Sequence, residues 1–159
     1  MVVERIVSGG QTGADRGGLD AAIDLGIPHG GWCPAGRLAE DGTIPERYKL
    51  TETESADFAV RTERNVIDSD GTVLFTYGEP VGGSALTAEL ASVHDKPLLH
   101  LDLEEHGISS AAAQLAVWVA QNDVRVLNVA GSRESQAPGI AEAVREILLI
   151  SLGGDRRKL

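Results

Sequence analysis

The strongest constraint on the fold is the glycine-rich run IVSGGQTGADRGGLDAAIDLG, residues Ile6–Gly26. An apolar strand enters this run. In its second half, Leu19, Ala22 and Ile23 recur at helical spacing and predict a helix. Gly26 is placed to end that helix. Ordering glycine costs more conformational entropy than ordering any other residue, so this many glycines between a strand and a helix need a reason. We interpret the run as backbone that a ligand approaches closely.

Strand and helix patterns alternate along the rest of the chain. Apolar runs predict strands at 5–9, 71–78, 96–103 and 124–131, and helical periodicity predicts helices at 54–69, 84–95, 109–122 and 138–152. This alternation predicts an α/β fold: a single Rossmann-like three-layer domain over residues 1–152, with a mainly parallel sheet, followed by a polar tail at 153–159.

Residues 28–53 break the pattern, because they are rich in glycine, proline and charge. We expect a short strand and then a long loop, which is typical of a functional or mobile segment. Further along, Ser109 or Ser110 is placed to cap the alanine-rich helix. Alanine-rich helices suit close packing, so this helix also favours a homo-oligomer.

Composition excludes several classes of function. The 159 residues carry a net charge of −10, which argues against a nucleic-acid partner. The one cysteine, Cys33, excludes an internal disulfide and disfavours a thiolate zinc site. No apolar run approaches the roughly 18 residues of a membrane span, and the first residues do not resemble a signal peptide. We expect a cytoplasmic protein without a membrane partner.

Glycine segments occur at three strand-to-helix junctions: SGGQTGADRGG, GEPVGGSA and AGSRESQAPG. The carboxyl ends of parallel strands share one edge of a sheet, where ligands of α/β proteins bind. Helix starts add N–H groups without partners and a partial positive charge. Any one segment is equally compatible with a plain strand-to-helix turn. The three together predict a pocket for an anionic, phosphorylated small molecule.

The predicted ligand-binding residues come from all three segments: Gly9, Gly10, Gln11, Thr12, Gly13, Arg16, Gly82, Gly83, Ser84, Ser132 and Arg133. Gly82–Ser84 are expected to hold an oxyanion, Gln11 and Thr12 to donate hydrogen bonds, and Arg133 to contact phosphate. Arg16 is assigned to the same anion, with an exposed surface arginine as the alternative. We interpret Asp15 as a helix cap rather than a catalytic group.

Other side chains carry weaker signals. Trp32 can stack on a base or a flat cofactor ring. Cys33 fits a packing thiol better than a molybdenum or pterin ligand. The glycine spacings match neither a P-loop nor a dinucleotide fingerprint. The four histidines are scattered along the chain and form no metal-ligand pattern. We therefore predict no metal site built from protein side chains.

The second segment, GTVLFTYGEPVGGSALTAEL, resembles an eroded Pro-Gly-Gly-x-Gly-Thr-x-x-Glu motif of the SLOG superfamily, which includes the lysine-decarboxylase-like "Lonely guy" phosphoribohydrolases. Gly82, Gly83 and Glu89 match this motif, whereas Ala85 stands for its third glycine and Leu86 for its threonine. The superfamily also carries an arginine before the preceding strand, and Arg61 occupies that relation here.

One branch is more similar. The stretches IVSGGQTGADRGGLDAAIDLGIPHGGWCPAGRLAEDGTIP, RTERNVIDSDGT and LNVAGSRES-x-x-PGI resemble the proposed molybdenum carrier family, also described as circularly permuted YpsA-like SLOG proteins. The resemblance covers nearly the whole chain. It implies a protein that binds a nucleotide, a molybdenum-cofactor-like compound or another anionic small ligand. Molybdate would suit the same N–H groups, and no residue specifies molybdenum over phosphate.

The superfamily also implies an alternative: hydrolysis of the N-glycosidic bond of a nucleoside monophosphate or a related nucleotide, with Arg61 and Glu89 as the catalytic pair. Such cleavage develops oxocarbenium charge on the ribose, which a carboxylate stabilises. The eroded motif favours the binding protein, and the surviving Arg61 and Glu89 favour the enzyme.

Overall fold

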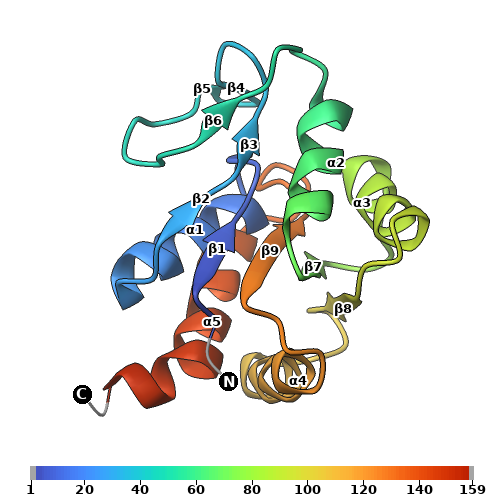
Figure 1. Cartoon of the computed structure of the whole chain (residues 1–159). Coiled ribbons are helices and arrows are strands. Elements are labelled where there is room, and N and C mark those ends of the chain that lie inside the picture. Colours follow the sequence, from blue (N-terminus) through green and yellow to red (C-terminus); the bar gives the residue numbers. More distant parts are fainter. Residues whose placement is uncertain (1–2, 158–159) are drawn as a thin grey trace.

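The computed structural model describes residues 3–157 and contains one central parallel sheet (Figure 1). Its strand order is β2-β1-β9-β7-β8, and every neighbouring pair is parallel. The strands are β1 (Arg5–Val7), β2 (His29–Gly30), β7 (Gly71–Thr76), β8 (Leu98–Asp102) and β9 (Val126–Gly131). The predicted α/β class with a parallel sheet is confirmed.

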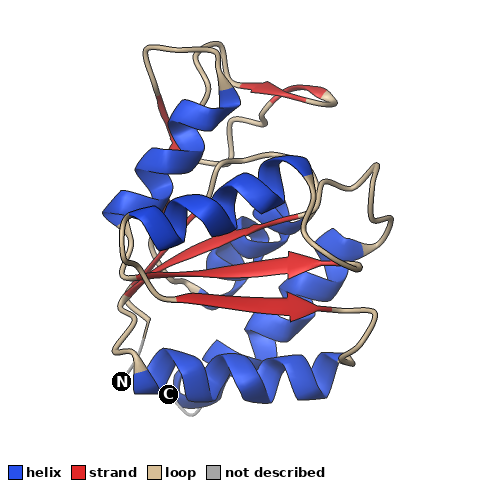
Figure 2. Ribbon diagram, turned by 90° about the vertical axis from the view of Figure 1, so that its right-hand side faces the viewer, coloured by secondary structure: helices blue, strands red, loops and turns tan. Residues whose placement is uncertain are grey.

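Five helices cover this sheet on both faces (Figure 2). On one face, α5 (Ile140–Arg157) packs against α1 (Ala14–Leu25) and α4 (Ile108–Gln121). On the other, α2 (Phe58–Asp68) packs against α3 (Gly82–Val93). The result is the three-layer Rossmann-like arrangement that the alternating pattern predicted.

The core lies around the two middle strands of the sheet. All residues of β7 are buried, which explains the apolar Val73–Phe75 at its centre, since helices cover both of its faces. The inward residues predicted for the last helix, Ile140, Val144 and Ile147, are fully buried in this core. The alanines Ala111 and Ala112 of α4 are buried there as well.

Residues 28–53 are more ordered than the long loop that we expected. Besides β2 they form β3 (Trp32–Cys33), which pairs with β6 (Thr51–Glu52), and a hairpin of β4 (Leu38–Ala39) and β5 (Gly42–Thr43). The part of this segment from β3 to β6 lies beyond the carboxyl ends of β1 and β9 (Figure 1). It has a small core of its own, formed by Leu19, Cys33, Ile44 and Tyr48. Its few apolar residues lack a regular period, so the sequence pattern did not reveal the order.

Three predicted helix boundaries need correction. Asp15 does not cap α1: the N-cap residue is Gly13, and no side chain caps it. Gly107 is the N-cap of α4, so Ser109 and Ser110 lie in its first turn. Helix α5 continues to Arg157, into the predicted polar tail, and residues 158–159 lie outside the described part. Within the described residues, no helix combines the length and the apolar character needed to cross a membrane.

Candidate functional site

A cleft of about 260 Å³ opens at the carboxyl edge of the sheet, between the loop after β1, the end of β9, and helices α2 and α3. Its lining contains predicted residues from all three glycine segments. They are Gly9 and Gln11 from the first, Gly82, Gly83 and Ser84 from the second, and Arg133 from the third, together with Arg61. The structure therefore brings together side chains and backbone that are far apart in the sequence.

The N-terminus of α3 forms one wall of the cleft. Gly82 and Gly83 are exposed, and a Cβ atom on either would meet nothing within 4 Å. Among the described residues, no acceptor pairs with the amide hydrogens of these two glycines. The first amides of a helix have no partner within the helix and carry a partial positive charge. This wall therefore offers N–H groups to an anion.

Gln11 offers a second donor from the opposite wall. Its Oε1 accepts the amide hydrogens of Thr12 (3.1 Å) and Glu40 (2.9 Å), and these contacts fix the orientation of the side-chain amide. The Gln11 residue is only 6% exposed, and its Nε2 atom is buried without a hydrogen-bond partner among the described residues. Buried polar groups are nearly always hydrogen-bonded, so this donor stands out as unpaired within the described part of the protein.

Arg61 places a buried cation in the cleft. The residue is 8% exposed, and its Nη1 donates to the carbonyl oxygen of Gly9 (2.7 Å) while its Nε donates to Thr62 Oγ1 (3.2 Å). Burial lowers the pKa of Arg61, and the nearby Asp15 carboxylate opposes that shift. Arginine stays protonated in proteins, so the guanidinium remains a positive group facing the cleft.

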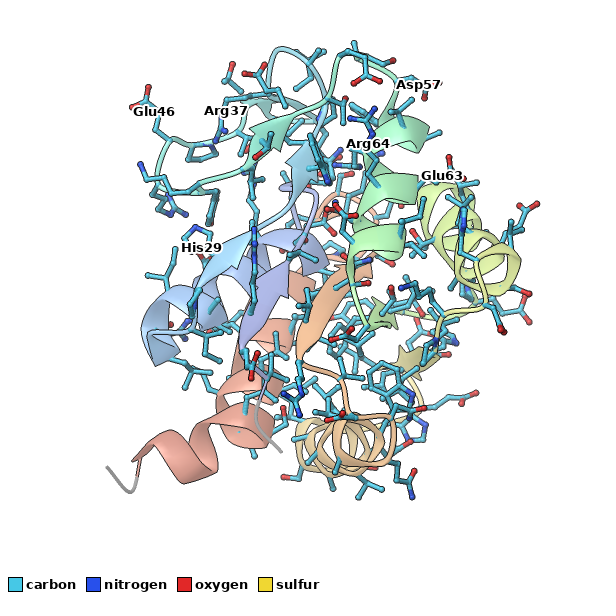
Figure 3. All side chains as sticks on the ribbon, in the orientation of Figure 1. His29, Arg37, Glu46, Asp57, Glu63 and Arg64 are labelled. Carbon is cyan, nitrogen blue, oxygen red and sulfur yellow. The ribbon has the colours of Figure 1, made fainter. Side chains whose placement is uncertain are left out.

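Helix α2 is fixed on both sides, which sets the position of Arg61. Glu63 and Arg64 leave the helix on different sides (Figure 3). Glu63 Oε2 lies 2.9 Å from Nε2 of His94 at the end of α3, and the Arg64 guanidinium lies 4.9 Å from the centre of the Trp32 ring. One turn from Arg61, Asn65 accepts the Trp32 amide hydrogen and donates to the Trp32 carbonyl oxygen (2.8 and 3.0 Å).

Asp15 is the carboxylate of the cleft, which the sequence analysis had interpreted as a helix cap. It is 7% exposed, and its Oδ2 accepts the amide hydrogen of Gln11 (3.1 Å). Burial raises the pKa of Asp15, against the opposing effect of the positive Arg61. Its place in the helix pattern resembled a cap, and only the fold shows that it faces a ligand-sized cavity.

Several predicted ligand residues instead hold the hairpin β4–β5 in place. Arg16 forms a bidentate ion pair with Asp41 (2.6 and 2.8 Å) and donates to the Gly10 carbonyl oxygen (3.1 Å). The Thr12 hydroxyl donates to Glu40. Neither Arg16 nor Thr12 lines the cleft, so both face a more open hollow on the other side of the loop.

Gly13 and Ser132 serve packing. Gly13 has φ +83°, and a Cβ atom there would lie 2.3 Å from the Ser132 carbonyl oxygen. That carbonyl accepts the Ala14 amide hydrogen (3.0 Å). A would-be Cβ at Gly10 would clash with Ile44 and Leu50. These residues shape the loop from behind the cleft.

The backbone amides of the three loops do not all converge, contrary to the expectation. In the first loop, the amides of Gln11, Thr12 and Ala14 already have protein acceptors. In the third, the Glu134 carboxylate accepts from Gly139 (2.6 Å) and Ala141 (3.1 Å) at the start of α5. Within the described residues, the second loop offers the free amides of Gly82 and Gly83, and the Gly9 amide of the first loop also lacks an acceptor at the cleft. The first and third loops add Gln11 and Arg133 as side chains.

Glu89 is exposed and does not line the cleft. Thr87 takes the inward position of that helix and donates to the Gly83 carbonyl oxygen (2.9 Å). The cleft is also lined by four residues that were not among the predicted ligand contacts: Thr62, Asn65, Asn128 and Gln136. Two signals were available: Thr62 and Asn65 share a helical face with Arg61, and Asn128 interrupts an apolar strand.

No group of three or more His, Cys, Asp or Glu within the described range is arranged to hold a metal ion. Cys33 is buried in the small core beside Tyr48, as expected for a packing thiol. Trp32 lines a different cavity, together with Arg5 and Asp68, rather than the cleft. The cleft is thus a site of N–H donors, one arginine at its floor, one at its rim and one carboxylate.

Comparisons with known proteins match nearly the whole chain. The model of the circularly permutated YpsA SLOG family matches residues 6–152. A crystal structure at 1.45 Å resolution, of a Syntrophus aciditrophicus SB protein with the provisional name of molybdenum carrier protein, shares 47% sequence identity. It superposes with a TM-score of 0.93 and covers 95% of this chain and 96% of its own. No curated protein matches the chain.

Proposed function

The chain belongs to the circularly permuted YpsA SLOG family, and from that premise we propose that its cleft binds an anionic small molecule, a nucleotide or a molybdenum-cofactor-like compound, through the phosphate group. The ligand lies between the start of α3 and the loop after β1, in contact with Gln11 and Arg61. In this proposal the protein is a carrier or a sensor.

The Nε2 group of Gln11 is the observation that carries this proposal. It is a buried donor without a protein partner, and leaving such a group unsatisfied costs about 1–3 kcal/mol. A phosphate oxygen removes this cost. The amides of Gly82 and Gly83 and the guanidinium of Arg61 support the same anion, since helix starts and buried arginines both favour negative charge.

The provisional name of the relative supports molybdenum as the cargo. The hydrogen-bond donors of the cleft determine which chemical form of molybdenum can bind there. The cleft offers N–H groups, which suit the oxygens of a phosphate. Among the residues described, its lining holds no thiol or imidazole that would ligate the metal directly. A molybdenum cofactor would therefore be held by its phosphate, with Gln11 and Arg61 as the contacts.

A hydrolase of nucleoside monophosphates is the second candidate, and the position of Asp15 favours it. A carboxyl group with a raised pKa in a cleft, beside an arginine, is typical of catalytic sites. In this alternative, water adds to the anomeric carbon, the base leaves, and ribose 5-phosphate is formed. The carboxyl group is Asp15, because Glu89 lies outside the cleft.

The variant Gln11→Glu tests the binding proposal. It keeps the Oε1 acceptor of Gln11 and replaces the orphan donor by a second acceptor. Calorimetry and thermal shift with AMP, ADP-ribose, a phosphorylated pterin and inorganic phosphate should give at least one ligand. Ligand at 100 times its Kd stabilises the fold by about 2.7 kcal/mol.

We expect Gln11→Glu to weaken that ligand by tenfold or more, and the control Glu89→Gln to bind as the unchanged protein does. No thermal shift with any of these compounds at millimolar concentration, or an unchanged affinity of Gln11→Glu, would contradict the proposal. Incubation with AMP and chromatography of the products separate the candidates: released adenine identifies the hydrolase, and intact AMP identifies the binding protein.

A further inference from the structure

We infer that the cleft selects anions that bring a hydrogen-bond donor of their own, and that Asp15 is the residue that makes this selection. The inference rests on the proposed function, since it concerns the same cleft. It adds a chemical criterion for the ligand: an anion that offers only acceptor oxygens, such as sulfate or molybdate, is disfavoured.

The position of Asp15 provides the first step. Its carboxylate lies in the same cleft lining as Gln11 and Arg61, and the residue is only 7% exposed. Oδ2 accepts the Gln11 amide hydrogen. An ionised carboxylate has about four acceptor sites and no hydrogen to donate. A ligand beside it therefore meets a charged acceptor, and Asp15 is the one carboxylate in the described cleft lining.

The protein leaves most of this acceptor capacity unfilled. The Ser8 hydroxyl is close enough to favour the Asp15 carboxylate, but it donates its hydrogen to the Val129 carbonyl oxygen (2.7 Å). Arg61 directs Nη1 to Gly9 and Nε to Thr62. Among the described residues, Gln11 N–H is therefore the donor that pairs with this carboxylate in hydrogen-bond geometry.

The charges that face the site give the energetic reason. Asp15, Arg61 and Arg133 are the charged residues of the described cleft lining, and Arg16 lies behind Asp15 on its own helix. An oxyanion oxygen against the carboxylate places two acceptors in contact without a shared hydrogen, which is unfavourable in a site of low dielectric. A P–OH or sugar hydroxyl at the same place donates to the carboxylate instead.

Ordinary anions separate on this criterion. At neutral pH, hydrogen phosphate keeps a P–OH hydrogen, whereas sulfate and molybdate carry none, although all three have similar size and shape. Phosphorylated sugars and nucleotides bring hydroxyl groups. Free molybdate is thus a poor ligand of this cleft, and molybdenum reaches it only within an organic compound that supplies donors.

The experiment measures calorimetric affinities of phosphate, sulfate and molybdate at equal ionic strength near neutral pH, and of ribose 5-phosphate against methyl phosphate. The proteins are the full chain, Asp15→Asn and the control Glu89→Gln. Asp15→Asn keeps an acceptor for the Gln11 amide and adds N–H donors. Melting curves check that each variant is folded.

We expect phosphate to bind at least tenfold more tightly than sulfate and molybdate, and ribose 5-phosphate at least tenfold more tightly than methyl phosphate. Both preferences should disappear in Asp15→Asn and persist in Glu89→Gln. Sulfate or molybdate binding as tightly as phosphate, or preferences that Asp15→Asn leaves intact, overturn this inference while anion binding stands. If no phosphorylated compound binds, both the inference and the proposed function fail.

Discussion

The Nη1 atom of Arg61 donates to the carbonyl oxygen of Gly9 at 2.7 Å, although the two residues are 52 positions apart in the sequence. This bond ties helix α2 to the loop after β1. It holds the buried guanidinium against the loop that carries Gln11 before any ligand arrives. Groups fixed in this way lose little freedom on binding, which favours affinity.

Gly9→Ala should disrupt this bond. A Cβ atom at Gly9 would lie 2.4 Å from Arg61 Nη1 and 2.8 Å from its Cζ, so the buried guanidinium would have to move. Overpacking of this kind typically costs about 1–3 kcal/mol. We expect a loss of that size in the free energy of unfolding by denaturant, and a tenfold weaker anion affinity by calorimetry. Unchanged values for both quantities would show that Arg61 can relocate freely.

Gly83→Ala should separate stability from binding. A Cβ atom there meets nothing within 4 Å, and alanine is favoured over glycine in a helix by up to about 1 kcal/mol. We expect an equal or higher melting temperature. Anion affinity should fall, because the methyl group stands where the ligand approaches the amides. Gly154→Ala in α5 is the matched control: also in open space, it should leave affinity unchanged. Tighter binding by Gly83→Ala would contradict the assigned wall.

Asp15→Asn should stabilise the protein without ligand near neutral pH. Burial raises the pKa of Asp15 in the folded state above its ordinary value of 3.8. The free energy of unfolding therefore falls as the pH rises through the raised pKa, because the unfolded chain loses this proton earlier. The asparagine variant lacks this penalty. Its melting temperature should exceed that of the unchanged chain near pH 7, and the difference should vanish toward about pH 4, where Asp15 is protonated.

The same melting curves, recorded across this pH range, provide the check. A lower melting temperature for Asp15→Asn near pH 7 would mean that the ionised carboxylate contributes more through its contacts than it loses by burial. Glu89→Gln, which removes an exposed carboxyl group outside the cleft, serves as the control for the loss of one negative charge.

Glu40→Gln should change the response to acid. Glu40 joins the hairpin β4–β5 to two loops: it accepts from the Ser135 hydroxyl (2.5 Å), the Thr12 hydroxyl and the Ser135 amide (3.2 Å). These bonds, with those of Ser135 first, hold the pKa of Glu40 below its usual 4.5. A lowered pKa gives stability that is present above the ordinary value and is lost as the pH falls through the folded one.

Hydrogen exchange of the Ser135 amide measures this connection. In the unchanged chain, protection should fall with acidification below about pH 4.5. Glu40→Gln should show weaker protection at neutral pH, by about 0.5–1.5 kcal/mol for a lost hydrogen bond, and little further change in acid. If the two proteins respond identically to acid, the loss of protection comes from another group. Asp41 is an example, because its hydrogen bond with Arg16 lowers its pKa.

The sequence predicted the fold well because strand and helix periods are local properties. The runs that became β7, β8 and β9 were recognisable from their apolar residues, and Gly26 ends α1 in the left-handed conformation that its position suggested. Residues 28–53 were expected to hold one short strand and a long loop, and the additional strands β3 to β6 were missed. Their order comes from Tyr48 and Ile44 packing with Cys33 and Leu19.

The site was predictable in place but not in detail. Parallel strands bring their carboxyl ends together, so the convergence of Gln11, Gly83 and Arg133 followed from topology. Topology alone did not predict which backbone amides are already hydrogen-bonded. The Glu134 carboxylate and the Ser132 carbonyl oxygen accept some of them, and no local sequence pattern reveals these contacts. The predicted homo-oligomer stays a prediction.

The middle of the sheet joins strands from opposite ends of the sequence: β1 pairs with β9, with Arg5 opposite Val126 and Val7 opposite Asn128. During translation, β1 leaves the ribosome long before its neighbour exists. Gln11 can then be exposed, but Arg133, which completes the cleft, has not been synthesised. The complete cleft therefore exists only after β9 has been synthesised and has paired with β1.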